Sequence, residues 1–416
     1  MRNVFDQYSQ PENRLTHALV CTIDADRSLL RPFLRWAGAR DIPSSARLRI
    51  TEQQVPGEAA PGDETEGRGL PDACIFDDDG WALLIEAKVQ AGVSLGQLRR
   101  HVATAQRHGF DKPYLLLLSV DDPPKRMPAK SAHRAWRDVY GWFRKKAASS
   151  SWARIFTEYV EAFESRMIAE DYSVRGTLTM FDGLRFDADN PFNYREGKRL
   201  IRLLGDELQK RKDLQKIGVD PKGSRRSSIT GRTGTSVWDF LPIKAARGAN
   251  NFTDFPHLTI SVREKVVGIA ITVPHAVRGG FRTKLKRVGE DGFFEMIGDI
   301  GRRLRPVLRK SKGSTARVYA LQRHYRSQRS GEITDARLDA DLRTIVPGKR
   351  REAKYQPQWV RAIYEVITQK RSNIQFGLDV LFSYKCPIVR SPKAIDLFAE
   401  SWKAMSPIIA FVIDDQ

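Results

Sequence analysis

The sequence predicts an α/β protein built from two domains, and three observations support this prediction. Short runs of β-branched, aromatic and aliphatic residues alternate with longer stretches in which apolar residues recur at helical spacing. The chain has 416 residues, which is more than one ordinary domain, and its hydrophobic content of 41% is enough for globular cores. Charge also divides unevenly at Asn190, which predicts domains at 1–189 and 190–416.

Two apolar runs in the first domain, at 70–76 and 81–89, predict a β-hairpin. The turn Asp78-Asp79-Gly80 lies between them, and Asp-Gly between two such runs is a strong hairpin signal. Successive side chains on a strand alternate faces, so Glu86 and Lys88 project to one side, while Ala87 turns its side chain away and leaves its carbonyl available. Asp72, on the partner strand, can approach the same point.

These residues offer the chemistry of a metal-dependent phosphodiesterase. The carboxylates of Asp72 and Glu86, with the Ala87 carbonyl, are the hard oxygen ligands that Mg²⁺ or Mn²⁺ prefers. A bound ion acidifies a water molecule and polarises a phosphoryl oxygen. Lys88 can orient that water or stabilise charge developing on the phosphate. We therefore predict Asp72, Glu86 and Lys88 as catalytic residues.

The motifs Pro71-Asp72 and Glu86-Ala87-Lys88 resemble those of the PD-(D/E)xK nuclease superfamily. This resemblance implies a restriction-endonuclease-like core in the order αβββαβ, here followed by a basic α+β C-terminal domain. The order is matched over about the first 120 residues by a helix that starts near Glu12, strands at 47–55, 70–76 and 81–89, a helix at 94–108 and a strand at 114–120. The resemblance implies a Mg²⁺-dependent endonuclease, acting on DNA in preference to RNA.

The same resemblance points to accessory residues. In several branches of the superfamily an acidic residue on the first helix completes the metal site, which makes Glu12 a further candidate ligand; alternatively, Ser9-Gln10-Pro11-Glu12 fits a capping box. Gln97 is similar to a glutamine that some relatives place near the active centre. Three basic side chains on the same helix either meet phosphate or form a solvated face, namely Arg99, Arg100 and His101.

The excess positive charge lies in the second half. The formal net charge is +20; residues 1–190 hold 26 Lys and Arg against 27 Asp and Glu, whereas residues 191–416 hold 44 against 23. A basic half joined to a phosphodiesterase-like half favours nucleic acid as a shared substrate, although an arginine-rich composition also serves solubility. Weaker candidate nucleic-acid contacts in this half are Arg225, Arg226, Arg282, Lys284, Arg302 and Arg303.

Apolar periodicity predicts the remaining elements. In the first domain, helices are expected at 132–146 and 153–171. In the second domain, helices are expected at 194–212, 293–310, 358–370 and 392–404. Strands are expected there at 258–263, 266–273, 376–382 and 408–413, and a loop at 218–236.

Composition also bounds location and partners. No apolar run approaches the length of a membrane span and residues 1–10 lack the apolar core of a signal peptide, so we expect a cytoplasmic protein without membrane contact. Cys21, Cys74 and Cys386 are far apart, which predicts neither a zinc site nor a disulfide. By analogy of fold, a role in antiviral defence, restriction or repair is expected, as a homodimer or with a defence-system partner.

Three alternatives remain open from the sequence. The protein could bind nucleic acid or regulate through a degenerate nuclease fold without turnover, although an intact set of Asp72, Glu86 and Lys88 argues against this. RNA could replace DNA as the substrate. Endonucleolytic and exonucleolytic cleavage are not distinguished.

Overall fold

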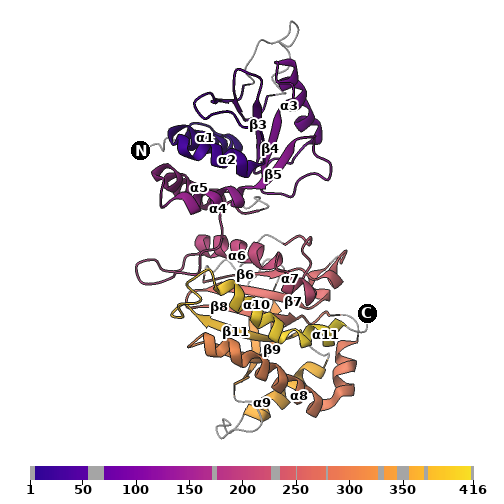
Figure 1. Ribbon diagram of the computed structural model, residues 1–416. Coiled ribbons are helices and arrows are strands. Elements are labelled where there is room, and N and C mark those ends of the chain that lie inside the picture. Colours follow the sequence, from indigo (N-terminus) through magenta and orange to yellow (C-terminus); the bar gives the residue numbers. More distant parts are fainter. Residues whose placement is uncertain are drawn as a thin grey trace. The chain divides into compact units, whose positions relative to one another are not determined.

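The chain forms a mixed α/β protein with two sheets in two compact units, Met1–Met180 and Phe181–Gln416 (Figure 1). This computed structural model describes residues 5–54, 70–170, 176–225, 235–249, 251–277, 280–326, 332–343, 356–369 and 373–413. The second unit begins before Asn190, because Phe181, Leu184 and Phe186 are buried in its hydrophobic core.

A five-stranded sheet, as far as the described residues go, organises the first unit in the order β1-β2-β3-β4-β5. Its strands are β1 (Arg49–Glu52), β2 (Ala73–Phe76), β3 (Ala82–Lys88), β4 (Tyr114–Ser119) and β5 (Ser131–Ala135). β1, β2 and β3 pair antiparallel, which confirms the predicted hairpin, whereas β4 and β5 continue the sheet in parallel. The Asp77 carboxylate closes the hairpin turn by accepting hydrogen bonds from the amides of Asp79 and Trp81.

Helices cover both faces of this sheet, and Figure 1 shows α3 on the opposite side of the strands from α1. The helices are α1 (Pro11–Ala25), α2 (Leu30–Ala37), α3 (Leu95–Arg107), α4 (Trp136–Lys146) and α5 (Ser151–Glu170), with a short 3₁₀ turn η1 (Arg27–Leu29). All except α3 pack on the face that carries Ala73, Ile85 and Ala87. α3 packs on the face that carries Cys74 and Leu84. This strict alternation determines which polar residues can meet.

The predicted helix at 132–146 is wrong in its first turn. Ser131–Ala135 forms β5, which pairs in parallel with β4, and α4 begins only at Trp136. Tertiary pairing with a buried neighbouring strand overrides a local pattern that is compatible with helix. The aromatic residues Trp136, Tyr140 and Phe143 are buried in the core, as predicted.

The second unit contains a six-stranded antiparallel sheet within the described ranges, in the order β10-β9-β11-β8-β7-β6. Its strands are β6 (Ser236–Leu241), β7 (His257–Arg263), β8 (Val266–Val273), β9 (Thr315–Tyr325), β10 (Glu332–Asp341) and β11 (Ile374–Ser383). β7 and β8 form the predicted hairpin. β10 was not predicted, although charged and apolar residues alternate from Asp335 to Asp341 as expected of a strand.

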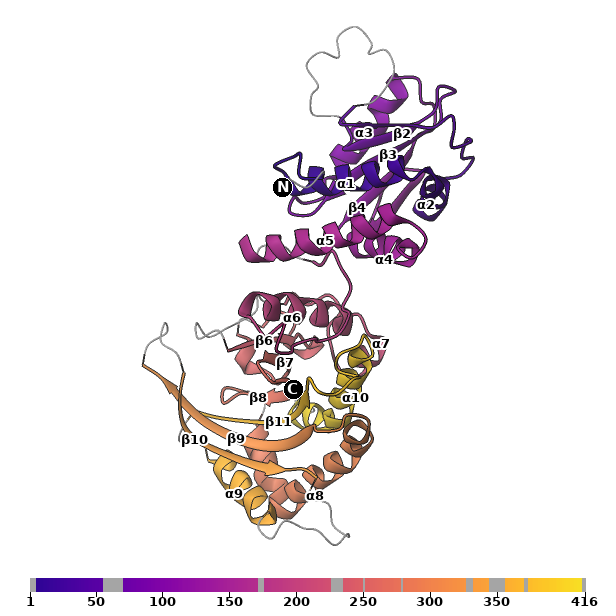
Figure 2. The same ribbon diagram turned by 90° about the vertical axis from the view of Figure 1, so that its left-hand side faces the viewer.

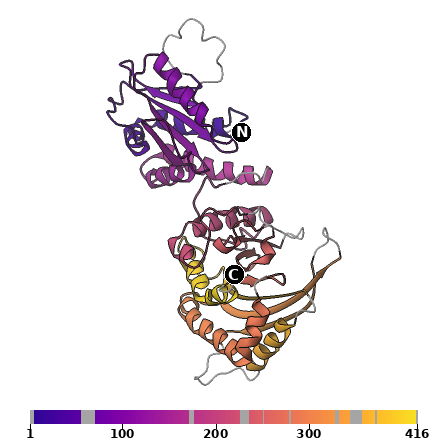
Figure 3. The same cartoon turned by 90° about the vertical axis from the view of Figure 1, so that its right-hand side faces the viewer.

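Helices line this curved sheet (Figure 2, Figure 3). They are α6 (Tyr194–Gln209), α7 (Lys212–Lys216), α8 (Phe281–Lys310), α9 (Gln356–Thr368), α10 (Ala394–Met405) and α11 (Pro407–Ile413), with 3₁₀ turns η3 (Lys244–Ala246) and η4 (Phe252–Asp254). Phe293 of α8 and Phe398 of α10 contact Phe376 and Phe382 on β11. These two aromatic pairs attach both helices to the same face of β11, because Phe376 and Phe382 are an even number of residues apart.

The predicted last strand at 408–413 is wrong, since these residues form α11. Ile408, Ile409 and Val412 are buried while Ala410 is exposed, which is a helical pattern. A short apolar run does not distinguish helix from strand by periodicity.

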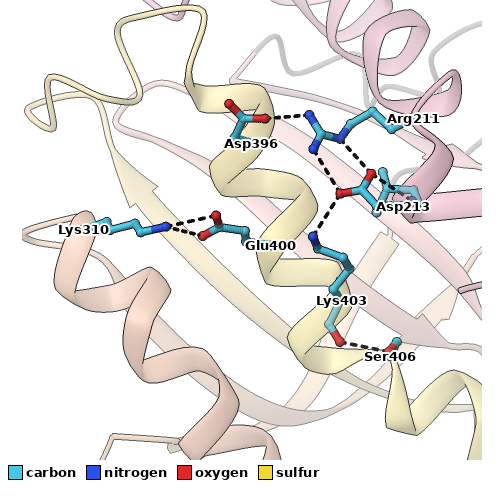
Figure 4. A network of polar contacts seen from close by, with 8 residues as sticks. Arg211, Asp213, Lys310, Asp396, Glu400, Lys403 and Ser406 are labelled. Carbon is cyan, nitrogen blue, oxygen red and sulfur yellow. Dashed lines mark hydrogen bonds and ion pairs between the residues drawn. The ribbon is translucent and has the colours of Figure 1, made fainter. Parts of the chain in front are cut away.

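An ion-pair network ties α10 to the start of α7 (Figure 4). The Arg211 guanidinium donates hydrogen bonds to Asp213 at 3.0 Å and to Asp396 at 2.7 Å. The Lys403 ammonium donates to Asp213 at 2.9 Å. The hydrogen bonds from Arg211 and Lys403 hold the pKa of Asp213 well below its ordinary value. This partly exposed network engages two basic residues of the second unit, Arg211 and Lys403, in contacts with neighbouring carboxylates of the same unit.

Candidate active site

The predicted catalytic residues meet on the α3 side of the first sheet, where β3 ends. Ala87 lies between Glu86 and Lys88, and its side chain packs on the opposite face. The Asp72 carboxylate oxygen Oδ2 accepts a hydrogen bond from the Ala87 amide at 2.7 Å. The backbone pairing of β2 with β3 starts at Ala73, and the Asp72 side chain adds one further hydrogen bond between the two strands just before it. Asp72 is thereby fixed to the backbone between Glu86 and Lys88.

Glu86 is only 1% exposed, yet it is surrounded by polar partners. Its Oε1 forms an ion pair with Lys88 Nζ at 2.5 Å and accepts a hydrogen bond from Gln97 Nε2 at 2.8 Å. His101 Nε2 lies 2.9 Å from Oε2. Burying a carboxylate without partners is costly, and the contacts of Oε1 offset that cost, whereas Oε2 has no hydrogen-bond partner among the described residues. The predicted accessory residue Gln97 therefore contacts the site directly.

His101 departs from its expected position. His101 is fully buried on the inner side of α3, next to Glu86, so it cannot contact a phosphate at the surface. Leu98 and Ala105 on the same side of α3 pack into the core with Leu84. His101 lies one helical turn after Gln97, so both side chains point toward the Glu86 carboxylate. His101 thus supports Glu86 from inside the fold.

Asp72 and Glu86 repel each other. Burial and the negative charge of Glu86 raise the pKa of Asp72 to about 6, against the opposing effects of the Ala87 amide and Lys88. Two carboxylates that share a site in this way are costly when both are ionised. A divalent cation between them would remove that cost, so the electrostatics suit a cation site.

Glu12 has a clear structural contact. Its Oε1 accepts hydrogen bonds from the amides of Val89, Gln90 and Ala91, at 3.2, 2.8 and 3.0 Å. Burial alone would raise the pKa of Glu12, but these amides bring it below its ordinary value. The residue preceding α1 is Gln10, whose side chain makes no capping hydrogen bond, so the capping-box expectation is wrong. Glu12 joins α1 to the segment that follows β3.

Two polar residues beside Lys88 were missed from the sequence. Ser119 is the register partner of Lys88 across β3 and β4, so the two side chains share a face. Ser119 Oγ lies 2.9 Å from His133 Nε2 on β5, and it donates to the Asp121 carbonyl at 2.6 Å. Burial lowers the pKa of His133. Only the parallel register brings these residues together, and the sequence carries no signal for it.

The candidate phosphate contacts differ in their exposure. Arg99 and Arg100 are exposed on α3, the helix that supplies Gln97 to the site. Arg302 and Arg303 are half-exposed on α8 and pair with Asp299. These four arginines can reach a ligand in solvent.

Other candidates in the second unit have internal contacts. Arg225 is 11% exposed and pairs with Asp206. Arg282 is half-buried and donates hydrogen bonds to the His275 carbonyl and imidazole, at 3.1 and 3.2 Å. Lys284 lies over the Phe411 ring, 5.3 Å from its centroid. Arg226 falls outside the described residues.

Comparisons with known proteins bring no further constraint. No protein-family model matches the chain, and the search of curated proteins found no similar sequence. Among the helices that the structure describes, none is long and apolar enough to cross a membrane. The function of this chain is therefore inferred from the chemistry of its own residues.

Proposed function

We propose that the first unit is a Mg²⁺- or Mn²⁺-dependent nuclease with a restriction-endonuclease-like core, and that it hydrolyses phosphodiester bonds of DNA. The observation that carries this proposal is the meeting of Asp72, Glu86 and Lys88 on one face of the sheet. The order α1, β1, β2, β3, α3, β4 agrees with the αβββαβ order of that superfamily, with α2 as an addition.

The donor set fits the proposed ion. Carboxylate oxygens are the ligands that Mg²⁺ and Mn²⁺ prefer, and the repulsion that raises the pKa of Asp72 favours a cation there. When bound, the ion would acidify a water molecule and polarise the phosphoryl oxygen. Lys88, held at 2.5 Å from Glu86, is close enough to orient the attacking water or to stabilise charge on the phosphate. Gln97 fixes the orientation of Glu86 through its hydrogen bond to Oε1, and His101 lies beside the other carboxylate oxygen.

The basic second unit is proposed to hold the nucleic acid. Residues 191–416 contain 44 Lys and Arg against 23 Asp and Glu. Exposed arginines follow one another along α8, namely Arg302, Arg303, Arg305 and Arg309. Contacts with phosphates release counterions, so binding should weaken steeply with salt.

The direct experiment is a cleavage assay with Mg²⁺ or Mn²⁺ on supercoiled plasmid, linear duplex, single-stranded DNA and RNA. The proposal expects metal-dependent cutting of DNA by the wild type and none by Asp72→Asn or Lys88→Ala. Matched controls are Asp78→Asn, in the exposed hairpin turn, and Lys112→Ala, in the loop before β4. Both controls should cut like the wild type.

Three outcomes separate the alternatives. Cutting that survives in Lys88→Ala and Asp72→Asn would reject this site. Cutting of RNA alone would retain the site but replace the substrate. Salt-sensitive DNA binding without cutting of any polymer would reject the nuclease in favour of a binding protein that keeps the fold.

A further inference from the structure

A second cluster of metal-binding side chains lies on the other face of the first sheet. His17 and Cys21 are four residues apart on α1 and therefore neighbours on its surface. Glu52, the last residue of β1, pairs with Ala73, whose side chain packs on the α1 side. His17 Nδ1 lies 2.8 Å from Glu52 Oε1 and 3.5 Å from Cys21 Sγ. The ligand atoms of these three residues lie within 4.8 Å of one another.

We propose that His17, Cys21 and Glu52 bind a divalent ion of the zinc class. A tetrahedral Zn²⁺ places a thiolate sulfur and an imidazole nitrogen roughly 3.5 Å apart. Cys21 Sγ lies 3.5 Å from both Nδ1 and Nε2 of His17, so the separation from Nδ1 matches, but the imidazole or the thiol has to turn to bring the sulfur to the lone-pair side of Nδ1. The nitrogen and carboxylate oxygen would lie roughly 3.3 Å apart, so the present hydrogen-bonded pair has to open by about 0.5 Å.

The ligand types distinguish this ion from the one proposed beside Asp72. A thiolate, an imidazole and one carboxylate suit Zn²⁺ or Co²⁺, whereas Mg²⁺ prefers oxygen alone. His17 and Glu52 keep 11% and 21% of their side-chain surface exposed, so an ion can enter and a water can occupy the fourth position. The Tyr8 hydroxyl donates a hydrogen bond to Glu52 Oε2 at 3.0 Å and so orients the carboxylate.

This site would link α1 to the edge strand β1, independently of the proposed nuclease chemistry. The sequence predicted no zinc site because the cysteines are far apart. Here one cysteine is joined by a histidine one helical turn earlier and by a glutamate 35 residues beyond that histidine.

The test is a titration of the reduced, full-length protein with Co²⁺, followed by absorption. We expect a thiolate-to-cobalt charge-transfer band in the near ultraviolet that saturates at one ion per chain, and its loss when Zn²⁺ displaces the cobalt. Cys21→Ala should abolish the band, whereas Cys386→Ala, which removes a thiol of the second unit, should retain it. Tyr8→Phe should weaken Co²⁺ binding about 10-fold, as expected for a residue that orients a ligand.

Failure of this proposal is distinct from failure of the nuclease proposal. Absence of the band in the wild type would overturn the metal site without any variant, and persistence of the band in a folded Cys21→Ala would do the same. Glu52→Gln, which keeps the size of the side chain, offers a second variant and should bind Co²⁺ more weakly. The Asp72 site has oxygen ligands alone and cannot produce this band, so Asp72→Asn should leave it unchanged.

Discussion

Replacing Asp72 with asparagine is expected to stabilise the metal-free protein near neutral pH, although it should abolish cleavage. The pKa of Asp72 is raised from 3.8 to about 6. Between these values the folded state holds a proton that the unfolded chain has released, so the ionised group costs stability as pH rises. Each pKa unit corresponds to about 1.4 kcal/mol, which gives an upper bound of about 3 kcal/mol. Because Asp72 is only partly buried, we expect roughly 1 to 2 kcal/mol.

Urea unfolding with a metal chelator present, at about pH 8 and about pH 4, measures this effect. The variant should be more stable at the higher pH and equal to the wild type at the lower one, since an asparagine oxygen can still accept the Ala87 amide. The control Asp78→Asn changes a side chain that is 65% exposed and pairs with Arg49 at the surface. Its effect should stay within about 0.5 kcal/mol at both pH values.

Two results would refute the reasoning. A loss of stability in Asp72→Asn at the higher pH would mean that the Asp72 carboxylate is favourable in the metal-free fold. An equal gain at both pH values would exclude ionisation as its origin. Mg²⁺ should stabilise the wild type by mass action and leave the variant unaffected, so stabilisation of both would locate the ion elsewhere.

The remaining predictions concern three contacts. Gln97→Leu removes the donor to Glu86 and should reduce cleavage about 10- to 100-fold; an unchanged rate would show that Gln97 does not position Glu86. Glu12→Gln should destabilise the protein by about 1 to 2 kcal/mol near neutral pH. Folding lowers the pKa of Glu12, so the difference in unfolding free energy between wild type and variant should vanish as pH falls through that pKa. Urea unfolding at a series of acidic pH values measures this difference, and a difference that persists at the lowest pH would contradict the prediction. Asp213→Asn should cost about 1 kcal/mol, seen as a lower unfolding midpoint, and an unchanged midpoint would mean that its ion pairs add nothing.

Local signals in the sequence were sufficient for part of the fold and part of the site. The Asp78-Asp79-Gly80 turn between two apolar runs predicts the β2–β3 hairpin, and the alternation of strand faces places Glu86 and Lys88 on one side. β5 could not be predicted in this way, because its sequence Ser-Ala-His-Arg-Ala does not alternate between apolar and polar residues. All five residues are half-buried in the structure. Its position depends on pairing with β4, and so do the positions of Ser119 and His133.

The contacts of Glu86 have a consequence for how ion and substrate would bind together. A carboxylate oxygen has two lone pairs, and those of Oε1 are already directed at Lys88 and Gln97. An ion that binds this oxygen must therefore displace one of these two donors. If the ion displaces Lys88, a phosphate that attracts the Lys88 ammonium would make that displacement easier. Under the proposed function, metal and nucleic acid would then bind with positive cooperativity, each increasing the affinity for the other by the same factor.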